Sequence, residues 1–325
     1  MTLDEIAREL GLSKSTVSRA LSGKGRIGKE TVELVQNYVK NLEQAAKEKK
    51  IMENSTHNIG VVLPADVYYG GGAYFQNCLL GICEAASMLG YNVLLTTRKH
   101  NDIYELQSLV ENKKVDGIIL TRSLEDDKAL KYLTDIHFPV AVTGSCDYDD
   151  VIQVDTDNKE AAEKMTSMLI SRGFRKFALF IKDMKFIVDK KRYDGFCKAI
   201  LESGISMQNQ LFYYGSVKME FLDSIISNLI SQKVECVICG DDVICTMIMS
   251  RLQAEGYRIP TDIAVASLYN SPNLDCYSPS VTSVNVAASQ MGNIAGKQLI
   301  HCLLGRKYEI KTMVDYDILF RKSTN

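Results

Sequence analysis

The spacing of apolar residues at the start of the chain predicts two short helices joined by a tight turn. Leu3, Ile6, Ala7 and Leu10 recur at the intervals of three and four residues that place side chains on one helix face. Gly11 permits a left-handed turn without steric cost. The second helix is predicted to bury three residues on its inner side: Val17, Ala20 and Leu21. This arrangement is typical of a helix-turn-helix.

Polar residues mark where both helices begin. Thr2 and Glu5 have the spacing of a capping box, in which the hydroxyl and the carboxylate satisfy backbone N–H groups of the first turn. Ser13 is placed to cap the second helix.

A third helix is predicted from Glu30 to about Leu42, with Val32, Val35 and Val39 facing the first two helices. The polar sequence that follows has no convincing apolar stripe. We therefore expect a headpiece over residues 1–44, a linker with some helical propensity over 45–56, and a larger core over 57–325.

The core alternates short apolar runs with helical periods, which indicates parallel sheets covered on both faces by helices. The predicted strands are 59–63, 92–97, 116–120, 140–142, 177–181, 236–239 and 263–268. The predicted helices lie near 74–89, 102–111, 158–171, 189–203, 219–231, 242–255 and 286–304. So many strand–helix units favour an α/β class with two doubly wound subdomains over a single one.

Composition narrows the class of protein. The chain has 325 residues, of which 46% are hydrophobic, so it can form two or three domains with sizeable cores. It has no run of 18 apolar residues, and it starts with a capped helix and not with a signal peptide. Nine scattered cysteines suit a reducing compartment. We expect a cytoplasmic protein.

Charge is distributed unevenly along the chain. Residues 1–52 hold ten Lys or Arg and seven Asp or Glu, a balance of +3, whereas the remainder holds 28 against 33, a balance of −5. The N-terminal headpiece is therefore the part suited to a polyanion such as DNA.

The exposed side of the second helix carries groups that can read a DNA major groove. Arg19 or Lys14 could bond a guanine edge, while Lys24 and Arg26 in the following loop could contact the DNA backbone. Short hydroxyl side chains could reach base or phosphate oxygens: Ser15, Thr16 and Ser18, with Thr2 at the start of the first helix. The alternative is an ordinary helical hairpin with a solvated polar face.

Three further patterns are weak. Gly23, Gly25 and Gly28 spell GxGxxG, but the pattern follows a helix and not a strand, so dinucleotide binding is disfavoured. Cys236 and Cys239 form CxxC inside a predicted strand without a second cysteine pair or nearby histidine. The four histidines show no metal-ligand spacing. We expect no metal site and no cofactor.

The run DEIARELGLSKSTVSRALSG, followed by Ile27, Glu30, Thr31 and Val35, resembles the headpiece of the lactose-repressor and galactose-repressor (LacI/GalR) family of bacterial transcription regulators. Segments of the core such as DGIIL, GDDVICTMI and IPTDIAVASLYNSP fall in the family's order and spacing. The resemblance implies a periplasmic-binding-protein-like core, with subdomains of about 57–156 and 157–284 and the chain recrossing in 285–325.

The resemblance also implies function. It indicates a sequence-specific DNA-binding regulator, a repressor, acting as a homodimer on a pseudo-palindromic operator. Its DNA affinity would be controlled by a small-molecule effector, a sugar or sugar derivative, bound between the core subdomains. The sequence does not distinguish this from activation, or from a response to an acidic or non-sugar ligand.

The family has a hinge helix that pushes a leucine into the minor groove and kinks the duplex. Aligned without gaps on the next strand, Ala46 falls on the hinge's usual alanine and Ile51 on the leucine lever. The family's Tyr-x-Pro-Asn entry to the hinge is absent, and residues 42–45 replace it.

Two core residues fall where the family places effector contacts. Arg192 matches the effector-binding arginine, and Asp242 matches the aspartate that accepts ligand hydroxyls. A guanidinium fork and a carboxylate suit a polyol, since each can engage two neighbouring oxygens. The alternative is a structural ion pair between these two residues across the cleft.

Other residues could face the same cleft. Arg122 and Ser123 directly follow a predicted strand, and a second cation at Arg122 would favour an acidic or phosphorylated sugar. Three aromatic residues could stack on a sugar or could simply pack in the core or at its rim: Tyr69, Phe75 and Tyr269. Two departures from the family, a longer loop in PADVYYGGGAY and residues 267–270 in place of Gly-Phe-Asp-Asp, predict an individual pocket.

Two other classes of protein compete with this interpretation. A solute-binding receptor shares the predicted core but needs a signal peptide and has no use for a helix-turn-helix. An enzyme on a doubly wound fold needs a nucleophile elbow or a phosphate loop, and the sequence has no convincing example of either.

Overall fold

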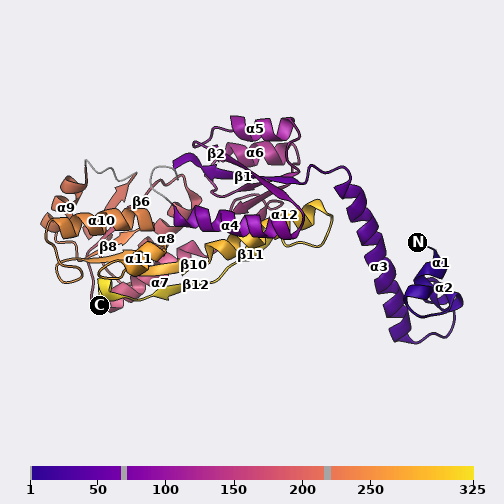
Figure 1. Cartoon of the computed structure of the whole chain (residues 1–325). Coiled ribbons are helices and arrows are strands. Elements are labelled where there is room, and N and C mark those ends of the chain that lie inside the picture. The colour runs from indigo at the N-terminus through magenta and orange to yellow at the C-terminus, as the bar shows by residue number, and fades with distance from the viewer. Residues whose placement is uncertain (1, 67–71, 216–220) are drawn as a thin grey trace. The chain divides into compact units, whose positions relative to one another are not determined.

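The computed structural model describes residues 2–66, 72–215 and 221–325 (Figure 1). The chain divides into two compact units. The first consists of Met1–Thr56 with His301–Lys307, and the second of His57–Ile300 with Tyr308–Asn325. Among the described residues, no helix has the length and apolar character needed to cross a membrane.

The first unit contains three helices around a small core. These are α1 (Leu3–Glu9), α2 (Lys14–Ser22) and α3 (Lys29–Met52). Gly11, at φ 64°, makes the left-handed turn that the sequence predicts, and Gly23, at φ 67°, ends α2 in the same conformation. The core is formed by buried residues from all three helices: Ile6, Ala7, Val17, Ala20 and Val35. Leu3 and Leu21, predicted to be buried, are instead 36% and 39% exposed, because the three-helix core is too small to cover the margins of each apolar stripe.

The expectation that the third helix ends near Leu42 and gives way to a linker is wrong. α3 continues without a break to Met52. The added turns are rich in Ala, Glu, Gln and Lys, which are good helix formers, and they contain neither Gly nor Pro. Glu48 in these turns makes a bidentate ion pair with Arg306 of the same unit, both N–O distances being 2.7 Å. Local propensity and this tertiary contact together maintain the helix where an apolar stripe is lacking.

The second unit has two lobes, each a six-stranded sheet flanked by helices (Figure 1). The first sheet has the order β11-β5-β4-β3-β1-β2 and the second β12-β10-β9-β8-β6-β7. All neighbouring strands are parallel except β10 and β12, which are antiparallel. The bounds of the first sheet are β1 (Asn58–Pro64), β2 (Asn92–Arg98), β3 (Gly117–Leu120), β4 (Val140–Thr143), β5 (Ile152–Asp155) and β11 (Lys311–Met313). Those of the second are β6 (Phe177–Ile181), β7 (Leu211–Tyr214), β8 (Cys236–Cys239), β9 (Ala264–Ser267), β10 (Thr282–Val286) and β12 (Tyr316–Leu319).

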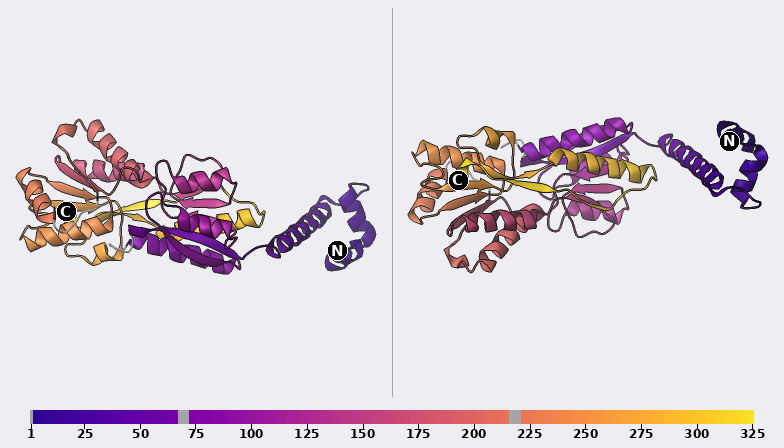
Figure 2. Two further views of the ribbon diagram at one scale, coloured as in Figure 1. Left: turned by 90° about the horizontal axis from the view of Figure 1, so that it is seen from above. Right: turned by 90° about the horizontal axis from the view of Figure 1, so that it is seen from below.

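Helices connect the strands, mostly near the predicted ranges, although Lys128–Asp135 and Pro272–Cys276 were not predicted. The helices are α4 (Ala73–Met88), α5 (Tyr104–Glu111), α6 (Lys128–Asp135), α7 (Asn158–Ser171), α8 (Ile187–Glu202), α9 (Leu222–Ser231), α10 (Asp242–Ala254), α11 (Pro272–Cys276) and α12 (Ala288–Leu303). The chain passes between the sheets after β5, after β10 and again between β11 and β12 (Figure 2). The recrossing expected near the end of the chain therefore takes place twice.

Close helix pairs hold each lobe together through glycine. A Cβ added at Gly195 of α8 would lie 2.1 Å from the carbonyl oxygen of Lys159 in α7. A Cβ added at Gly81 of α4 would lie 1.9 Å from the carbonyl oxygen of Ser289 in α12. The absent side chains let these backbones touch, which fixes α8 and α4 where they border the space between the lobes.

Candidate functional site

The exposed face of α2 presents the DNA-contact candidates on a rigid helix. Val17 and Ala20 are fully buried on its inner side, whereas Ser18 and Arg19 are exposed. The turn after α2 exposes two further cations, Lys24 and Arg26. Burial of one face thus determines which side chains remain free to meet a groove.

The polar residues at the helix starts already form some hydrogen bonds and ion pairs within the protein. Thr2 and Glu5 form the predicted capping box, with Thr2 N–H donating to Glu5 Oε2 at 2.7 Å. The Ser13 hydroxyl accepts from Thr16 N–H at 3.1 Å, and it lies within hydrogen-bond distance of the hydroxyls of Thr16 and Ser15. Lys14 pairs with an exposed carboxylate of α1, Asp4, at 2.6 Å. Within the part of the chain that the structure describes, Arg19, Lys24 and Arg26 form no such ion pair, so they offer charge to a partner at the lowest cost.

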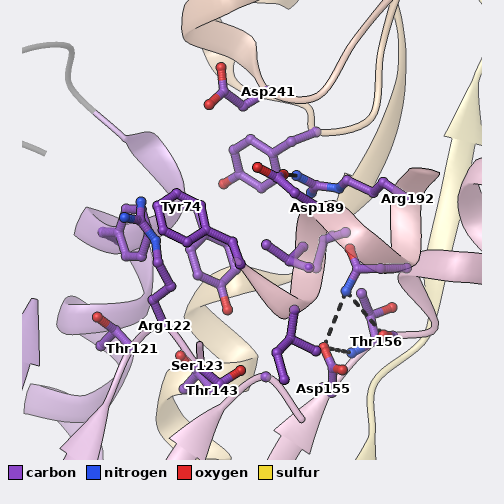
Figure 3. A pocket seen from close by; sticks show the side chains of 18 of the residues that line it. Tyr74, Thr121, Arg122, Ser123, Thr143, Asp155, Thr156, Asp189, Arg192 and Asp241 are labelled. Atoms are coloured by element: carbon purple, nitrogen blue, oxygen red, sulfur yellow. Dashed lines mark hydrogen bonds and ion pairs between the residues drawn. The ribbon is translucent and has the colours of Figure 1, made fainter. Parts of the chain in front are cut away.

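A cavity with an empty volume of about 870 Å³ lies between the two lobes of the second unit (Figure 3). Much of its wall comes from residues just after the carboxyl ends of parallel strands, where open α/β sheets bind their ligands. These residues are Thr121, Arg122 and Ser123 after β3, Gly144 and Ser145 after β4, Thr156 after β5, Lys182 after β6, and Asp241 and Asp242 after β8. The first turns of α4 and α8 supply most of the remaining wall.

Arg192 is the buried cation of this cavity. It projects from α8, is 9% exposed, and donates from one terminal nitrogen to the carbonyl oxygen of Leu268 at 3.2 Å. Its other terminal nitrogen lies 3.8 Å from the Asp189 carboxylate. Its Nε has no hydrogen-bond partner among the described residues. A buried guanidinium with an unused donor is a candidate ligand-binding group, although this enclosed Nε reaches a ligand oxygen only if the side chain shifts.

Asp242, at the first position of α10, is the buried acceptor. Burial raises the pKa of its carboxyl. Within the part of the chain that the structure describes, this carboxylate forms no ion pair. The expected alternative, a structural ion pair between Arg192 and Asp242, is not formed. The neighbouring Asp241 instead pairs with Lys182 at 2.7 Å.

Aromatic rings form one wall of the cavity. Tyr74 packs edge-on against Phe75 and Tyr269, with ring centroids 5.2 Å and 5.7 Å apart. The Arg122 guanidinium lies over two rings, 5.0 Å from the centroid of Phe75 and 4.3 Å from that of Phe186. Figure 3 shows Tyr74 and Arg122 on one side of the cavity and Arg192 with Asp189 on the other.

Asp155 and its neighbours complete the wall where the chain first passes between the sheets. The Asp155 carboxylate accepts from Lys191 Nζ at 2.9 Å and from the side chain of Asn158 at 3.2 Å. The buried hydroxyl of Thr156 has no hydrogen-bond partner among the described residues. Ser123 donates its hydroxyl hydrogen to the Ser145 carbonyl oxygen at 2.7 Å, so it shapes the wall and is already satisfied as a donor.

The two lobes touch directly beside the cavity. Leu124 and Phe186 form an isolated antiparallel bridge, with Glu125 N–H donating to the Lys185 carbonyl oxygen at 2.8 Å. An ion pair between Glu125 and Lys190 reinforces this contact. The cleft is therefore closed along one edge by the chain's own residues.

Residues 2–44 match the family described as bacterial regulatory proteins, lacI family, and residues 56–314 match periplasmic binding proteins and the sugar-binding domain of the LacI family. The chain belongs to the LacI family.

Other members of the LacI family resemble it along nearly their whole length. The HTH-type transcriptional regulator RegA of Clostridium saccharobutylicum is 25% identical over 99% of both chains. The HTH-type transcriptional regulator MalR of Staphylococcus xylosus is 26% identical over 100% of this chain and 98% of the relative. A crystal structure of the probable maltose operon transcriptional repressor of Staphylococcus aureus is 26% identical, with a TM-score of 0.76 over 83% of this chain and 99% of that one. These relatives are transcriptional regulators and not enzymes.

The structure of this LacI-family protein brings most of the predicted effector residues to one place. Phe75, Arg122, Ser123, Arg192, Asp242 and Tyr269 all line the cavity between the lobes. Tyr69 lies outside the described residues. Ile51 is half-buried in the last turn of α3, within the continuous helix that replaces the expected linker.

Sequence reasoning missed several lining residues. They are Tyr74, Thr143, Asp155, Thr156, Lys182, Asp189 and Asp241. Asp155 and Thr156 were missed because β5, which mixes the polar Gln153 and Asp155 with apolar residues, was not recognised as a strand. Asp241 and Lys182 carried a usable signal, since each follows a predicted strand at its carboxyl end.

The weak patterns carry no site in the structure. Cys236 and Cys239 are fully buried in β8, where burial raises the pKa of both thiols and keeps them protonated. The glycine pattern of residues 23–28 caps α2 and begins α3. Within 2–66, 72–215 and 221–325, no cluster of three or more His, Cys, Asp or Glu side chains could hold a metal ion.

Proposed function

We propose that this LacI-family protein is a cytoplasmic repressor whose operator affinity is controlled by a neutral sugar bound between the lobes of its core. The family supplies the coarser function, DNA-binding transcription regulation with a sugar-binding domain. The nature and position of the ligand are inferred from the chemistry of the cavity.

The observation that carries the proposal is a pair of unused buried polar atoms in a charge-balanced cavity. Arg192 Nε and Thr156 Oγ1 are buried without hydrogen-bond partners among the described residues, on two different parts of the cavity wall. Leaving such atoms unpaired is costly, at about 1–3 kcal/mol each. A ligand with several hydroxyl groups could satisfy both once these enclosed side chains shift toward the cavity, and it could donate to Asp242 as well.

The balance of charge favours a neutral ligand. Each cation in or beside the cavity has a carboxylate partner: Arg122 with Asp66 at 2.8 Å, Lys182 with Asp241 at 2.7 Å, Lys191 with Asp155 at 2.9 Å, and Arg192 with Asp189 at 3.8 Å. The carboxylate of Asp242 is left over, which disfavours an anion. The acidic or phosphorylated sugar that Arg122 suggested from sequence is thus the weaker candidate, because Asp66 already neutralises that cation.

The aromatic wall supports the same choice. Tyr74, Phe75 and Tyr269 present apolar surface, against which the C–H faces of a sugar ring can pack while its hydroxyls point to Arg192 and Asp242. The cavity thus has one apolar wall and one hydrogen-bonding wall, which match the C–H face and the hydroxyl groups of a pyranose. The solved structure from Staphylococcus aureus is that of a probable maltose operon transcriptional repressor, which agrees with a carbohydrate effector.

For DNA, we propose that Arg19 reads a base edge and that Lys24 and Arg26 hold the phosphate backbone. These three cations are exposed and form no ion pair with another described residue, whereas Lys14 first has to leave Asp4. Ser15, Thr16 and Ser18 are smaller contributors, and Thr2 acts mainly through its cap. Ile51 is proposed as a minor-groove residue from its position in the family alone.

We also propose a homodimer, since one headpiece contacts too few base pairs to specify an operator and a two-fold pair can read a pseudo-palindrome. Large exposed apolar residues on the first lobe offer a surface to a second copy: Leu80 and Met88 on α4, and Leu95 on β2. Their exposed fractions are 59%, 79% and 51%, unusual values for such side chains in a monomer.

The experiment is a thermal-shift screen followed by operator titration. Neutral mono- and disaccharides, uronates and sugar phosphates are compared, because a ligand that binds only the folded state raises the melting temperature by mass action. The sugar found is then tested on Arg192→Ala, on Arg192→Lys, which keeps a positive charge beside Asp189, and on Arg258→Ala as a matched surface control.

We expect both Arg192 variants to bind operator DNA near-normally without sugar and to lose the sugar-dependent change, while Arg258→Ala behaves as wild type. The coupling free energy between effector binding and DNA binding is typically ~1–3 kcal/mol. Unchanged response midpoints in both Arg192 variants would place the effector elsewhere. A response to uronates or sugar phosphates alone would replace the neutral ligand with an acidic one.

A further inference from the structure

The loop that follows β9, residues 268–271, contacts both residues that we propose as the main effector-binding groups. Its first residue, Leu268, accepts a hydrogen bond from Arg192 through its backbone carbonyl oxygen at 3.2 Å. Its last residue, Ser271, lies beside Asp242: burial raises the pKa of the Asp242 carboxyl, and the Ser271 hydroxyl acts in the opposite direction. The position of this segment, the effector loop, therefore helps to determine where the two ligand-binding groups lie.

The effector loop belongs to no helix or strand. The backbone N–H of Leu268 donates to a carbonyl oxygen of β8 at 2.8 Å, and that of Asn270 donates to one of β10 at 2.7 Å. Tyr269, whose side chain lines the cavity, has its carbonyl oxygen bound by the Ser267 hydroxyl at 2.7 Å. Irregular segments are more mobile than the elements they connect, so a side chain that holds this loop also affects the groups the loop contacts.

Asn270, inside the effector loop, is bound by Arg321, which follows β12. One terminal nitrogen of Arg321 lies 3.0 Å from Asn270 Oδ1 and 2.8 Å from the hydroxyl oxygen of Ser283 in β10. The same nitrogen donates to the carbonyl oxygen of Val281 at 2.7 Å. The other terminal nitrogen forms an ion pair with Asp275 of α11. With its side chain only 17% exposed, Arg321 thus joins the effector loop to β10 and α11 by charge-assisted bonds.

The backbone of Arg321 is itself fixed by buried hydroxyl groups. Its N–H donates to the Thr282 hydroxyl at 2.9 Å, and its carbonyl oxygen accepts from the same hydroxyl at 3.2 Å. The hydroxyls of Thr282 and Thr324 lie 2.6 Å apart, and the Ser323 hydroxyl donates to a carbonyl oxygen of β9 at 2.6 Å. Thr282 and Ser323 are fully buried. Because the chain on which Arg321 lies is held in this way, its guanidinium restrains the effector loop.

We propose that Arg321 is a positioning residue of the effector site. Through Asn270 it holds the effector loop in the place where the loop meets Arg192 and Asp242. Neither Arg321 nor Asn270 is among the described residues that line the cavity, so Arg321 acts on the ligand only through the loop. A loop that is already ordered spares the ligand the entropy cost of ordering it, which raises affinity. This inference rests on the proposed function, because it assigns the effector to the same cleft.

Two substitutions of Asn270 are similar in size and differ in the acceptor oxygen. Asn270→Leu removes the oxygen that Arg321 binds, whereas Asn270→Asp keeps an oxygen at that position. Arg321→Ala removes the guanidinium, and with it the bond to the Val281 carbonyl, so it tests the same contact from the other side. Thr324→Val is the matched control, because it breaks the bond to Thr282 and leaves the side chains of Asn270 and Arg321 intact.

The variants are compared by two measurements on the full chain. Calorimetric titration uses as its probe whichever of glucose, galactose, maltose and cellobiose binds the wild-type protein most tightly. Hydrogen exchange of the backbone amides of residues 264–276, measured by mass spectrometry without sugar, reports on the effector loop directly.

We expect Asn270→Leu and Arg321→Ala each to raise the dissociation constant of the probe by about five- to ten-fold and to speed exchange in residues 264–276. Asn270→Asp should stay within about two-fold of wild type. Thr324→Val should lower the melting temperature while it leaves sugar affinity and exchange in this segment unchanged.

Equal losses of sugar affinity in Thr324→Val and Asn270→Leu would overturn the proposal, because Arg321 would then act only on the stability of the fold. Asn270→Asp losing as much affinity as Asn270→Leu would overturn it as well, since the acceptor oxygen would not matter. If Arg192→Ala weakens sugar binding but Asn270→Leu and Arg321→Ala do not, the positioning role is wrong and the proposed function stands. Failure of the proposed function has a different signature. Arg192→Ala would then leave the affinity for the probe unchanged, or none of the four sugars would bind, and either result would overturn both proposals.

Discussion

Replacing the Asp242 carboxylate by an amide should separate the effector role of this residue from a structural one. Asp242→Asn keeps the size of the side chain and one acceptor oxygen but removes the charge. In the folded protein this carboxyl is buried at the start of α10, faces the cleft, and has no ion-pair partner among the described residues. The variant therefore removes little from the fold and a charged acceptor from the ligand.

The expected loss of affinity follows from hydrogen-bond strengths. A bond to a charged group contributes about 1.5–3 kcal/mol and a neutral bond about 0.5–1.5 kcal/mol. The difference, about 1–1.5 kcal/mol per ligand hydroxyl, corresponds to a five- to twelve-fold rise in the dissociation constant, to order of magnitude. Asp242→Ala, which leaves no acceptor, should cost about 1.5–3 kcal/mol per hydroxyl.

Stability should change in the opposite direction. Burial raises the pKa of the Asp242 carboxyl above its value in the unfolded chain. A raised carboxyl pKa opposes folding at any pH above the folded-state pKa, and this penalty disappears as the pH falls below the unfolded value. Asp242→Asn should thus melt at the same temperature as wild type or higher at pH 7, and the difference should shrink toward pH 3.

The assay is calorimetric titration of the sugar together with thermal melting from pH 3 to pH 8. Asp317→Asn, which alters an exposed carboxylate on β12 outside the cleft, is the control and should leave sugar affinity and melting temperature unchanged. If Asp242→Asn melts several degrees lower at pH 7 while binding the sugar normally, the residue holds the fold together and does not bind the effector.

Four further predictions concern other parts of the molecule. Arg19→Ala should lower operator affinity by about 1–3 kcal/mol and relax preference at one base pair, whereas Lys24→Ala should weaken all sequences alike; equal losses for Arg19→Ala on operator and random DNA in a binding titration would refute base reading. Gly195→Ala should lower the free energy of unfolding by about 1–3 kcal/mol or more, because the added Cβ would lie 2.1 Å from a backbone oxygen of α7. Denaturant titration measures this change. An unchanged denaturant midpoint would show that α7 and α8 separate easily. The hydrogen bonds from Arg306 lower the pKa of the Glu48 carboxyl from its ordinary 4.5 to about 2, so the pair stabilises the fold above pH 4.5 and this stabilisation is lost as the pH falls toward 2. Arg306→Ala should therefore lower the melting temperature at pH 7 and change it little near pH 2. A decrease in melting temperature that is independent of pH would contradict this. Sedimentation at micromolar concentration with operator bound should show a homodimer, and a bound monomer would disprove the two-fold arrangement.

Local signals in the sequence were strong wherever a single element decides the outcome. The helix-turn-helix could be predicted because its apolar spacing, the Gly11 turn and the Thr2 and Ser13 caps all act within a few residues. The parallel strands with continuous apolar runs were predicted because a strand covered on both faces has that pattern. The α/β class with two sheets follows directly from that alternation.

Elements whose sequence pattern is weak were not predicted correctly. β5, β10 and β12 mix polar with apolar side chains, and β7 is only partly buried, so their sequence patterns do not distinguish them from loops. The end of α3 was placed too early because a polar sequence without an apolar stripe can still be helical when its residues favour the helix and Glu48 meets Arg306.

The composition of the cleft was decided only by the tertiary structure. Arg192 and Asp242 could be carried over from the family one position at a time, but their partners come from strands that are distant in sequence and adjacent only in the folded sheets. The sequence could not show that Asp66 neutralises Arg122, or that Arg192 is held by Asp189 and not by Asp242. Charge compensation depends on distances of a few ångströms between separate elements, and it is this compensation that favours a neutral sugar over the acidic alternative suggested by Arg122.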